Sequence, residues 1–492
     1  MKYLNPVIRG FYPDPSVCYA GDRYYLVCSS FQYFPGVPLF ESTDLVNWKQ
    51  TGHVLTRPDQ VKLQNAWSSG GVFAPTIRCN DGILYVITNN NSTGENFYVS
   101  RALSDTEWSS PVTVMQDGID PSLLFDGGHC YFISNGTADD GEGGIVQCEI
   151  DIATGRKLSP ARCIWKGTGG RYLESPHMYK LGDEYYLMAA EGGTEYGHMI
   201  TLARSESVWG PFISCRNNPV LTNRDKAPFP IQGIGHGDLI EGPDGNLYIL
   251  CLGFRQIGKW LAYHHLGREV FLIPAYLDEE GLLHAGKDGT ADFEYEIPGD
   301  GVQQIKKRFT FADTDPGLDW CFIRHPVREN YSFSPDKWIL RGTDITIDMP
   351  KNPTFAGLRQ REPEGSVSVR VRIEGTGRAG ITLLMNEDEH YDLFIKTEED
   401  TGPRAVLRLN IGEAKYDACS VYLEDFSAVF KISFDSERYY FSVVSGGTET
   451  KLGSARTKYL STEVSGGFTG VMTGLFAENA AGEFTDFECI YT

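Results

Sequence analysis

Three acidic residues stand beside prolines at the start of strand-like stretches, and their type and placement suit acid–base chemistry. Asp14 lies between two prolines in F-Y-P-D-P-S, Asp120 precedes a proline in G-I-D-P-S, and Glu174 comes two residues before one in L-E-S-P. Carboxyl groups gathered in a partly dry cleft cannot all ionise easily, so their pKa values separate. One protonated and one ionised carboxyl is the arrangement that cleaves a glycosidic bond. These three residues are therefore candidate catalytic groups.

The acids belong to a pattern that occurs five times in the first 300 residues. Each copy has a short apolar strand, a turn containing Gly and usually Asp or Asn, and a second strand rich in Tyr, Leu, Val and Ile, which is a β-hairpin signature. The copies start roughly 45 to 62 residues apart, which suits one four-stranded blade per copy. Because long helical patterns are absent here, we expect an all-β chain that begins with a five-bladed β-propeller. A large sandwich is the alternative, but it would not need matched hairpins.

Aligning the copies on the tyrosine of the second strand shows which residue stands at the entry to each first strand. The first four entry positions hold Asp14, Ala74, Asp120 and Ser175, each followed by proline, and the fifth holds His236 after one inserted residue is allowed. Glu174 precedes its entry position by one residue. Since the innermost strands of a propeller surround its axis, we expect these side chains to meet at one mouth of the channel.

A single Asp before proline is most often only a turn-forming residue. Turn chemistry alone does not explain why Ala74 occupies the same position in the second copy. A shared pocket of acids and ordinary turn formation are therefore equal alternatives at this point.

Composition and charge limit the class of ligand. The chain has 492 residues, a formal net charge of −21 and a pI near 4.9, which argues against nucleic acid or an anionic membrane as partner. A neutral small molecule or neutral polymer is favoured instead, and the predicted partner is a short neutral oligosaccharide. We find no stretch of about 18 apolar residues and no secretion signal in the first residues. The eleven cysteines include no C-x-x-C pair, and several lie in apolar strand patterns. This usage predicts reduced thiols in a cytoplasmic protein.

The second half of the chain changes character after about residue 305. From about 320 to 492 the sequence alternates apolar and polar residues, as in G-S-V-S-V-R-V-R-I-E-G, with turns every 8–12 residues. This pattern predicts an antiparallel, jelly-roll-like β-sandwich. We therefore expect a propeller over 1–305 and a sandwich over 320–492 that packs on it. An independent carbohydrate-binding module is the other interpretation, but no flexible linker separates the halves.

Several motifs together resemble glycoside hydrolase family 43, in its β-xylosidase and α-L-arabinofuranosidase branch. They run in order from about residue 5 to 290 and include F-Y-P-D-P-S, G-I-D-P-S-L-L-F-D, Y-L-E-S-P-H-M-Y-K, G-I-G-H-G-D-L-I-E and H-H-L-G-R-E-V-F-L. The resemblance implies a five-bladed propeller that hydrolyses glycosides with inversion. Segments near 324–342 and 353–371 also resemble the C-terminal sandwich of the xylosidase branch, which lends a loop that closes the pocket.

The resemblance assigns roles to the acids and to one arginine. Asp14 corresponds to the general base and Glu174 to the general acid. Asp120 corresponds to the acid that orients Glu174 and raises its pKa. Arg268, in L-G-R-E-V-F-L, corresponds to an arginine that binds substrate hydroxyls beside the acids. The alternative interpretation is that Arg268 only forms an ion pair on the protein surface, but its place in this motif favours the substrate-binding role.

Three further residues are candidates on the same ground. His236 corresponds to a histidine near the propeller axis that in some relatives sits by a bound calcium ion, and a channel histidine without an ion is the alternative. Phe31 corresponds to an aromatic residue at the base of the sugar pocket. Phe73, in G-G-V-F-A-P, stands where xylosidase relatives commonly have Trp, which leaves the substrate preference open.

These observations predict an inverting exo-glycosidase that releases β-1,4-linked xylose from the non-reducing end of xylo-oligosaccharides in the cytoplasm. An α-L-arabinofuranosidase on the same machinery is the nearest alternative. A non-catalytic carbohydrate-binding propeller is the third, although each blade contributes a different residue, which favours chemistry over repeated binding sites. No cofactor is required beyond a possible calcium ion, and the sequence leaves the oligomeric state open, a homo-oligomer included.

Overall fold

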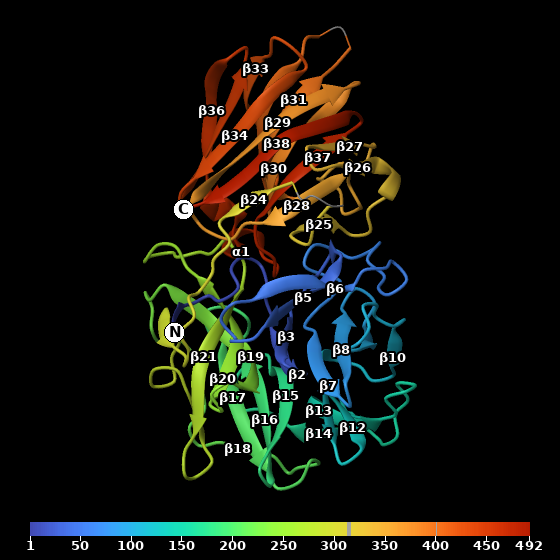
Figure 1. Ribbon diagram of the computed structural model, residues 1–492, viewed down its shortest axis with the longest axis vertical. Helices are drawn as coiled ribbons and strands as arrows, with labels where there is room; N and C mark the ends of the chain where they lie inside the picture. The colour runs from blue at the N-terminus through green and yellow to red at the C-terminus, as the bar shows by residue number, and fades with distance from the viewer. Residues whose placement is uncertain (312–315, 400) are drawn as a thin grey trace.

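The computed structural model describes residues 1–311, 316–399 and 401–492, and it divides into two β-rich parts (Figure 1). The lower part holds five four-stranded antiparallel sheets. The first two sheets comprise β2 (Ser16–Ala20), β3 (Arg23–Val27), β5 (Gly36–Ser42) and β6 (Lys49–Leu55), then β7 (Thr76–Asn80), β8 (Ile83–Asn90), β9 (Glu95–Ala102) and β10 (Val112–Val114).

The other three sheets follow the same sequential order. The third comprises β11 (Ile119–Asp126), β12 (His129–Thr137), β13 (Gly143–Ile150) and β14 (Arg162–Trp165). The fourth comprises β15 (Glu174–Leu181), β16 (Glu184–Glu191), β17 (Met199–Ser205) and β18 (Ile213–Ser214). The fifth comprises β19 (Ile231–Glu241), β20 (Leu247–Arg255), β21 (Glu269–Leu277) and β22 (Leu283–Ala285).

These sheets are the blades of a five-bladed propeller, as the repeats predicted. The first strands β2, β7, β11, β15 and β19 contact one another in ring order, and β19 meets β2 to close the ring. The second strands of the blades, such as β16 and β20, are buried along almost their whole length because neighbouring blades cover both faces. This explains why the sequences of these strands are continuous apolar runs and do not alternate apolar and polar residues.

The upper part is a sandwich of two sheets. One sheet has the order β26-β27-β38-β29-β34-β35-β36, with β24 (Arg308–Thr310) also paired to β38. Its other bounds are β26 (Tyr331–Phe333), β27 (Lys337–Arg341), β29 (Gly365–Glu374), β34 (Ser427–Phe434), β35 (Arg438–Ser445), β36 (Thr448–Arg456) and β38 (Ala481–Tyr491). The second has the order β33-β32-β31-β30-β37-β28-β25-β4. It is built from β25 (Trp320–Ile323), β28 (Phe355–Arg359), β30 (Gly377–Leu384), β31 (Glu389–Thr397), β32 (Arg404–Ile411), β33 (Ala414–Tyr422), β37 (Met472–Glu478) and β4 (Tyr33–Phe34).

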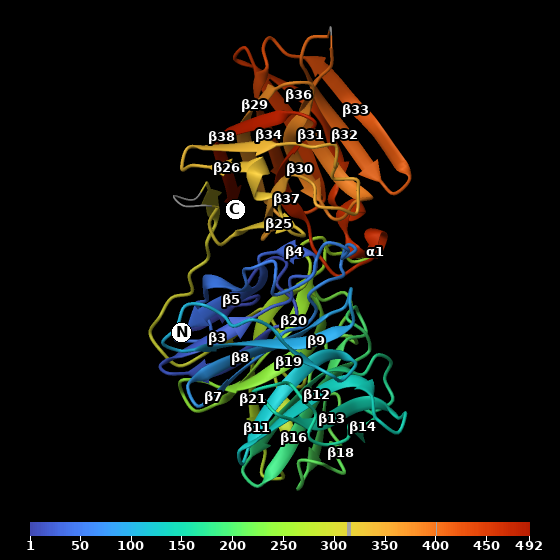
Figure 2. The same ribbon diagram turned by 90° about the vertical axis from the view of Figure 1, so that its right-hand side faces the viewer.

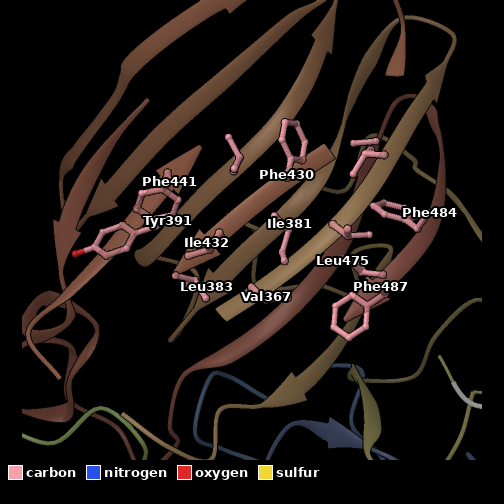
Figure 3. Close-up of a cluster of buried hydrophobic side chains, with 14 of the residues drawn as sticks. Val367, Ile381, Leu383, Tyr391, Phe430, Ile432, Phe441, Leu475, Phe484 and Phe487 are labelled. Atoms are coloured by element: carbon pink, nitrogen blue, oxygen red, sulfur yellow. The ribbon is translucent and has the colours of Figure 1, made fainter. Parts of the chain in front are cut away.

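Apolar residues from both sheets fill the space between them (Figure 3). Strand β29 shows the alternation that produces this core, because every second residue, including Val367, is buried while its neighbours face outward. Phe430, Ile432 and Phe441 reach the same core from β34 and β35, opposite Ile381 and Leu475 from β30 and β37.

The sandwich begins earlier than the predicted residue 320. Strand β24 already pairs with β38 at residues 308–310, so the sheet includes this segment. Three residues are too few to show an alternating pattern, and the preceding V-Q-Q-I-K-K is polar enough to resemble a connector.

The two parts are joined by shared backbone pairing and by a buried ion-pair network. Strand β4 comes from the first blade but pairs with β25, so the second sandwich sheet extends onto the propeller, and α1 (Thr462–Ser465) lies at the same junction (Figure 2). Glu362 of the sandwich accepts a hydrogen bond from Arg255 at 2.6 Å and also pairs with Arg9. In the described part of the chain no helix has the length and apolar character needed to cross a membrane.

Candidate active site

The entry residues of four blades share an uncommon backbone conformation. Asp14, Asp120, Ser175 and His236 have φ values of 57°, 51°, 58° and 44°, whereas Ala74 is not among the residues with positive φ. Asp and His tolerate the left-handed region better than most residues do. Backbone geometry therefore accounts for part of the residue choice, and it also explains why the second copy accepts alanine.

Asp14 lies in a setting that favours its ionised form. Its side chain accepts hydrogen bonds from Ser29 Oγ at 2.5 Å and from Arg268 Nη1 at 3.0 Å, and His236 Nδ1 is 3.5 Å from its Oδ1. Burial by itself would raise the pKa of Asp14, but the charges of Arg268 and His236 and the Ser29 hydrogen bond outweigh it and hold the pKa below its usual value.

Asp120 is also buried, and it is connected to Asp14 through side chains. Its Oδ2 accepts hydrogen bonds from the backbone N of Ser175 at 3.1 Å and from Ser175 Oγ at 3.2 Å. Ser175 Oγ is in turn 2.6 Å from His236 Nδ1. Burial and the nearby charge of Asp14 raise the pKa of Asp120, while His236 and Ser175 oppose that rise. Residues from the first, third, fourth and fifth blades thus form one chain of polar contacts.

Glu174, the first residue of β15, has the opposite pKa shift to Asp14. Burial and the negative charges of Asp120 and Asp14 together raise the pKa of Glu174 to about 8, although Arg268 opposes the rise. Near neutral pH this carboxyl therefore keeps its proton while Asp14 is ionised. The site holds the proton donor and the anion that acid–base cleavage requires.

A cavity of about 470 Å³ opens beside these groups and is lined by both parts of the molecule. Glu174 and Arg268 line it from the propeller, and residues 466–469 line it from the sandwich. Arg268 Nη1 donates to Thr194 Oγ1 at 2.8 Å, and its Nη2 donates to the backbone oxygen of Phe468 at 3.3 Å. The arginine therefore links the acids, the propeller loop and the sandwich loop.

Three phenylalanines pack together at this end of the cavity. Phe31 is buried, and its ring stacks on Phe468 with centroids 5.9 Å apart and meets the edge of Phe73 at 5.5 Å. The guanidinium of Arg268 lies over both Phe31 and Phe468, at 5.9 and 5.6 Å from the ring centroids. All seven predicted site residues are thus brought together, although their individual roles stay predictions.

Sequence reasoning missed Phe468, Thr194 and the hydrogen bond from Ser29. Phe468 lies in the sandwich, in S-G-G-F-T-G, and its backbone N is hydrogen-bonded to Ser69 Oγ at 2.8 Å. No local pattern marks it as a pocket residue. Ser29 stands two residues before the predicted site residue Phe31, which was the available signal, whereas none of the motifs given above includes Thr194.

Calcium near His236 stays a prediction, but the donors around Asp238, two residues further along β19, do not fit such an ion. Among the described residues no three His, Cys, Asp or Glu side chains are arranged to hold a metal. Asp238, a carboxylate close to the axis, has one oxygen 2.8 Å from Arg78 and the other 3.0 Å from it, and Arg78 is also 2.9 Å from His177 Nδ1. Calcium prefers several oxygen ligands, and a guanidinium would repel it. No step described below depends on a metal.

A propeller that places a protonated and an ionised carboxyl beside an arginine and an aromatic cluster has the groups that a glycoside hydrolase needs. Comparison with protein-family models agrees, because residues 3–283 match the model of glycosyl hydrolases family 43 and residues 308–490 match the β-xylosidase C-terminal concanavalin A-like domain. The chain belongs to glycosyl hydrolases family 43.

Several known proteins similar to the chain cover almost all of it. It is 38% identical to a non-reducing-end α-L-arabinofuranosidase of Bacteroides ovatus, over 99% of this chain and 95% of that protein. It is 34% identical to a xylosidase/arabinosidase of Butyrivibrio fibrisolvens, over 99% and 98%. Among solved structures, a xylan β-1,4-xylosidase from Bacillus halodurans superposes with a TM-score of 0.91 at 26% identity, covering all of both chains.

Proposed function

We propose that the protein is an inverting exo-glycosidase that releases single β-1,4-linked xylose residues from the non-reducing end of xylo-oligosaccharides. The observation that carries this proposal is the opposite pKa shift of Asp14 and Glu174 in one cluster beside the cavity. The names of the relatives, several of which are xylosidases, support the choice of sugar.

The proposed reaction is a single displacement at the anomeric carbon. Asp14 takes a proton from a water molecule, whose oxygen forms a bond to that carbon from one face of the sugar. The bond to the leaving oxygen breaks on the other face, and Glu174 gives that oxygen its proton. Asp120 raises the pKa of Glu174 through its charge, and Arg268 binds a sugar hydroxyl while it holds Asp14 in the ionised form.

The residues that form the cavity wall support the release of a sugar from the end of the oligosaccharide. The sandwich loop at 466–469, which includes Phe468, forms part of the cavity wall, and Phe31 and Phe73 pack against Phe468. A walled pocket of this kind suits one terminal sugar better than the middle of a polymer.

The acid assignment is tested by Glu174→Gln, with xylobiose as substrate. Because glutamine cannot donate the proton, kcat/KM is expected to fall about 10² to 10⁴-fold. Glu389→Gln is the matched control, since Glu389 is a buried glutamate with a raised pKa in the sandwich strand β31. Full activity of the Glu174→Gln protein would refute the acid assignment. A wild-type protein that binds xylo-oligosaccharides but hydrolyses none would instead favour a non-catalytic carbohydrate-binding propeller.

An α-L-arabinofuranosidase preference is the second candidate, and the name of the relative at 38% identity favours it. The family resemblance leaves the preference open at Phe73, where xylosidase relatives commonly have Trp. Rates on 4-nitrophenyl β-D-xyloside and 4-nitrophenyl α-L-arabinofuranoside decide between the two. A tenfold preference for the arabinofuranoside, about 1.4 kcal/mol of barrier, would overturn the xylosidase proposal.

We also propose that the enzyme works in the cytoplasm on short products of xylan degradation. All eleven cysteines are free thiols, which supports a reducing compartment. Cell fractionation with activity measurement in each fraction tests this, and activity found mainly outside the cell would contradict it.

A further inference from the structure

The outer part of the cavity carries an exposed aromatic side chain that the catalytic groups do not use. Tyr172 lines the cavity two residues before Glu174, and 65% of its surface is exposed. Its φ of 54° places it in the left-handed region, which a tyrosine rarely adopts. Strained backbone of this kind persists only where the surroundings hold it, and it clusters at functional sites.

Neighbouring residues hold this ring in place. The guanidinium of Arg171 lies over the Tyr172 ring, 5.2 Å from its centroid. Arg171 Nε donates to the backbone oxygen of Gly192 at 3.1 Å, and the guanidinium also forms an ion pair with Glu195. The backbone N of Gly192 donates to the oxygen of Arg171 at 2.7 Å. The segment carrying Tyr172 is therefore tied to the loop that carries Glu195.

A glycine gives the ring its position. A Cβ at Gly193 would come within 3.0 Å of Tyr172 Cδ2, and Gly193 has a φ of 81°. The ring therefore packs directly on the backbone of this loop. The next residue, Thr194, contacts Arg268, so the loop joins the ring to the catalytic cluster.

The role of Glu174 as proton donor indicates which sugar of the substrate lies near Tyr172. Glu174 delivers its proton to the leaving oxygen, so the leaving sugar lies next to Glu174 on the side away from the terminal sugar. Arg171 lies over the Tyr172 ring, but the large exposed fraction of the tyrosine leaves ring surface accessible where it lines the cavity. The apolar face of a sugar ring packs well against an aromatic face that is fixed in advance.

We propose that Tyr172, held by Arg171, Glu195 and Gly193, is the platform on which the leaving sugar of the substrate stacks, and that it makes the enzyme prefer oligosaccharides to pentosides with small leaving groups. This inference rests on the proposed glycosidase function. It assigns the leaving-group side of the site to residues of the fourth blade.

The test compares two substrates that share the terminal pentose. One is the disaccharide xylobiose, and the other is β-D-xylosyl fluoride, whose leaving group has no ring. Tyr172→Ala is expected to lower the ratio of kcat/KM for xylobiose to that for the fluoride about tenfold, because the variant loses several tens of Å² of apolar contact with the leaving sugar only. Tyr172→Phe keeps the ring and is expected to keep the ratio within about twofold.

The matched control is Tyr422→Ala. Tyr422 is 72% exposed and lies under the guanidinium of Arg404 at 4.7 Å, but it belongs to the sandwich strand β33 and does not line the cavity. An equal loss on both substrates in Tyr172→Ala, or an unchanged ratio, would overturn the platform. A wild-type protein that hydrolyses neither xylobiose nor the fluoride, nor the corresponding arabinofuranosides, would instead refute the proposed function itself.

Discussion

At the scale of single residues, the chemistry depends on two carboxyl groups that differ in environment more than in type. Asp14 lies beside a guanidinium, a serine hydroxyl and an imidazole, whereas the main influences on Glu174 are burial and the negative charges of other acids. The first set stabilises a carboxylate and the second stabilises a carboxylic acid. The same side-chain chemistry therefore supplies a base and an acid within one cluster.

This difference predicts a bell-shaped dependence of kcat/KM on pH. Activity needs Glu174 protonated, so it is expected to fall as the pH rises through about 8. Activity also needs Asp14 ionised, so the acidic limb is expected below the pH at which an ordinary aspartate titrates. A pH profile measured on xylobiose checks both limbs. An alkaline limb near the usual pKa of a glutamate would contradict the proposed environment of Glu174.

Asp120 is a positioning residue whose charge is predicted to act on Glu174. Asp120→Asn removes a negative charge that raises the pKa of Glu174, so the alkaline limb of the profile is expected to move to lower pH. Asp117→Asn serves as the control because Asp117 is exposed and bonds to Gln116 instead. A fall in kcat with an unmoved alkaline limb would show that Asp120 acts only by holding Ser175.

At the scale of elements, the innermost strands of the blades are joined by a buried polar network. The Asp238 carboxylate on β19 accepts hydrogen bonds from Ser16 on β2, Arg78 on β7 and Tyr179 on β15. Four of the five first strands thus meet at one carboxylate. Because β2 follows Asp14, and β15 and β19 carry Ser175 and His236, this network helps to fix the distances between these three entry residues, whereas Asp120 lies on β11, outside it.

The network predicts a large stability effect for a single change. Arg78→Met leaves the buried charge of Asp238 without its cationic partner, and we expect a loss of about 3–5 kcal/mol in the free energy of unfolding. Urea unfolding followed by fluorescence measures it. Arg370→Met, which removes an exposed pair with Asp486, is the control and is expected to change the midpoint little. A similar small change for Arg78→Met would mean that the network contributes little.

At the scale of the whole molecule, the sandwich completes the site instead of standing apart from it. The pairing of β4 with β25, the hydrogen bond of Ser69 with Phe468 and the contact of Arg268 with Phe468 all cross between the two parts. His264 adds a further link, since its backbone N and its Nδ1 both contact Glu463 of α1. These contacts favour a closing role for the sandwich over that of an independent carbohydrate-binding module.

This coupling predicts one cooperative unfolding transition for the intact protein, despite its two parts. Glu362→Ala would remove a carboxylate that pairs with the guanidinium groups of Arg9 and Arg255 at the junction. The propeller and the sandwich are then expected to unfold at different temperatures. Differential scanning calorimetry is expected to show one peak for the wild type and two for the variant. Two peaks in the wild type would contradict the coupling.

The sequence by itself determined the blades, the sandwich and the residues that stand at the strand entries. Hairpin patterns and alternation are local, because burial on one face of a strand leaves its mark every second residue. The repeat alignment therefore placed Asp14, Asp120 and His236 at equivalent positions, and the family motifs added Arg268.

Only the tertiary structure decided what surrounds those residues. Phe468 meets a serine 399 residues earlier in the chain, and Arg78 meets Asp238 160 residues later. Which residues line the cavity, and which carboxyl keeps its proton, depend on burial and on charges brought together from distant segments. Such contacts are set by how blades and sheets pack, and they leave no periodic trace in the chain.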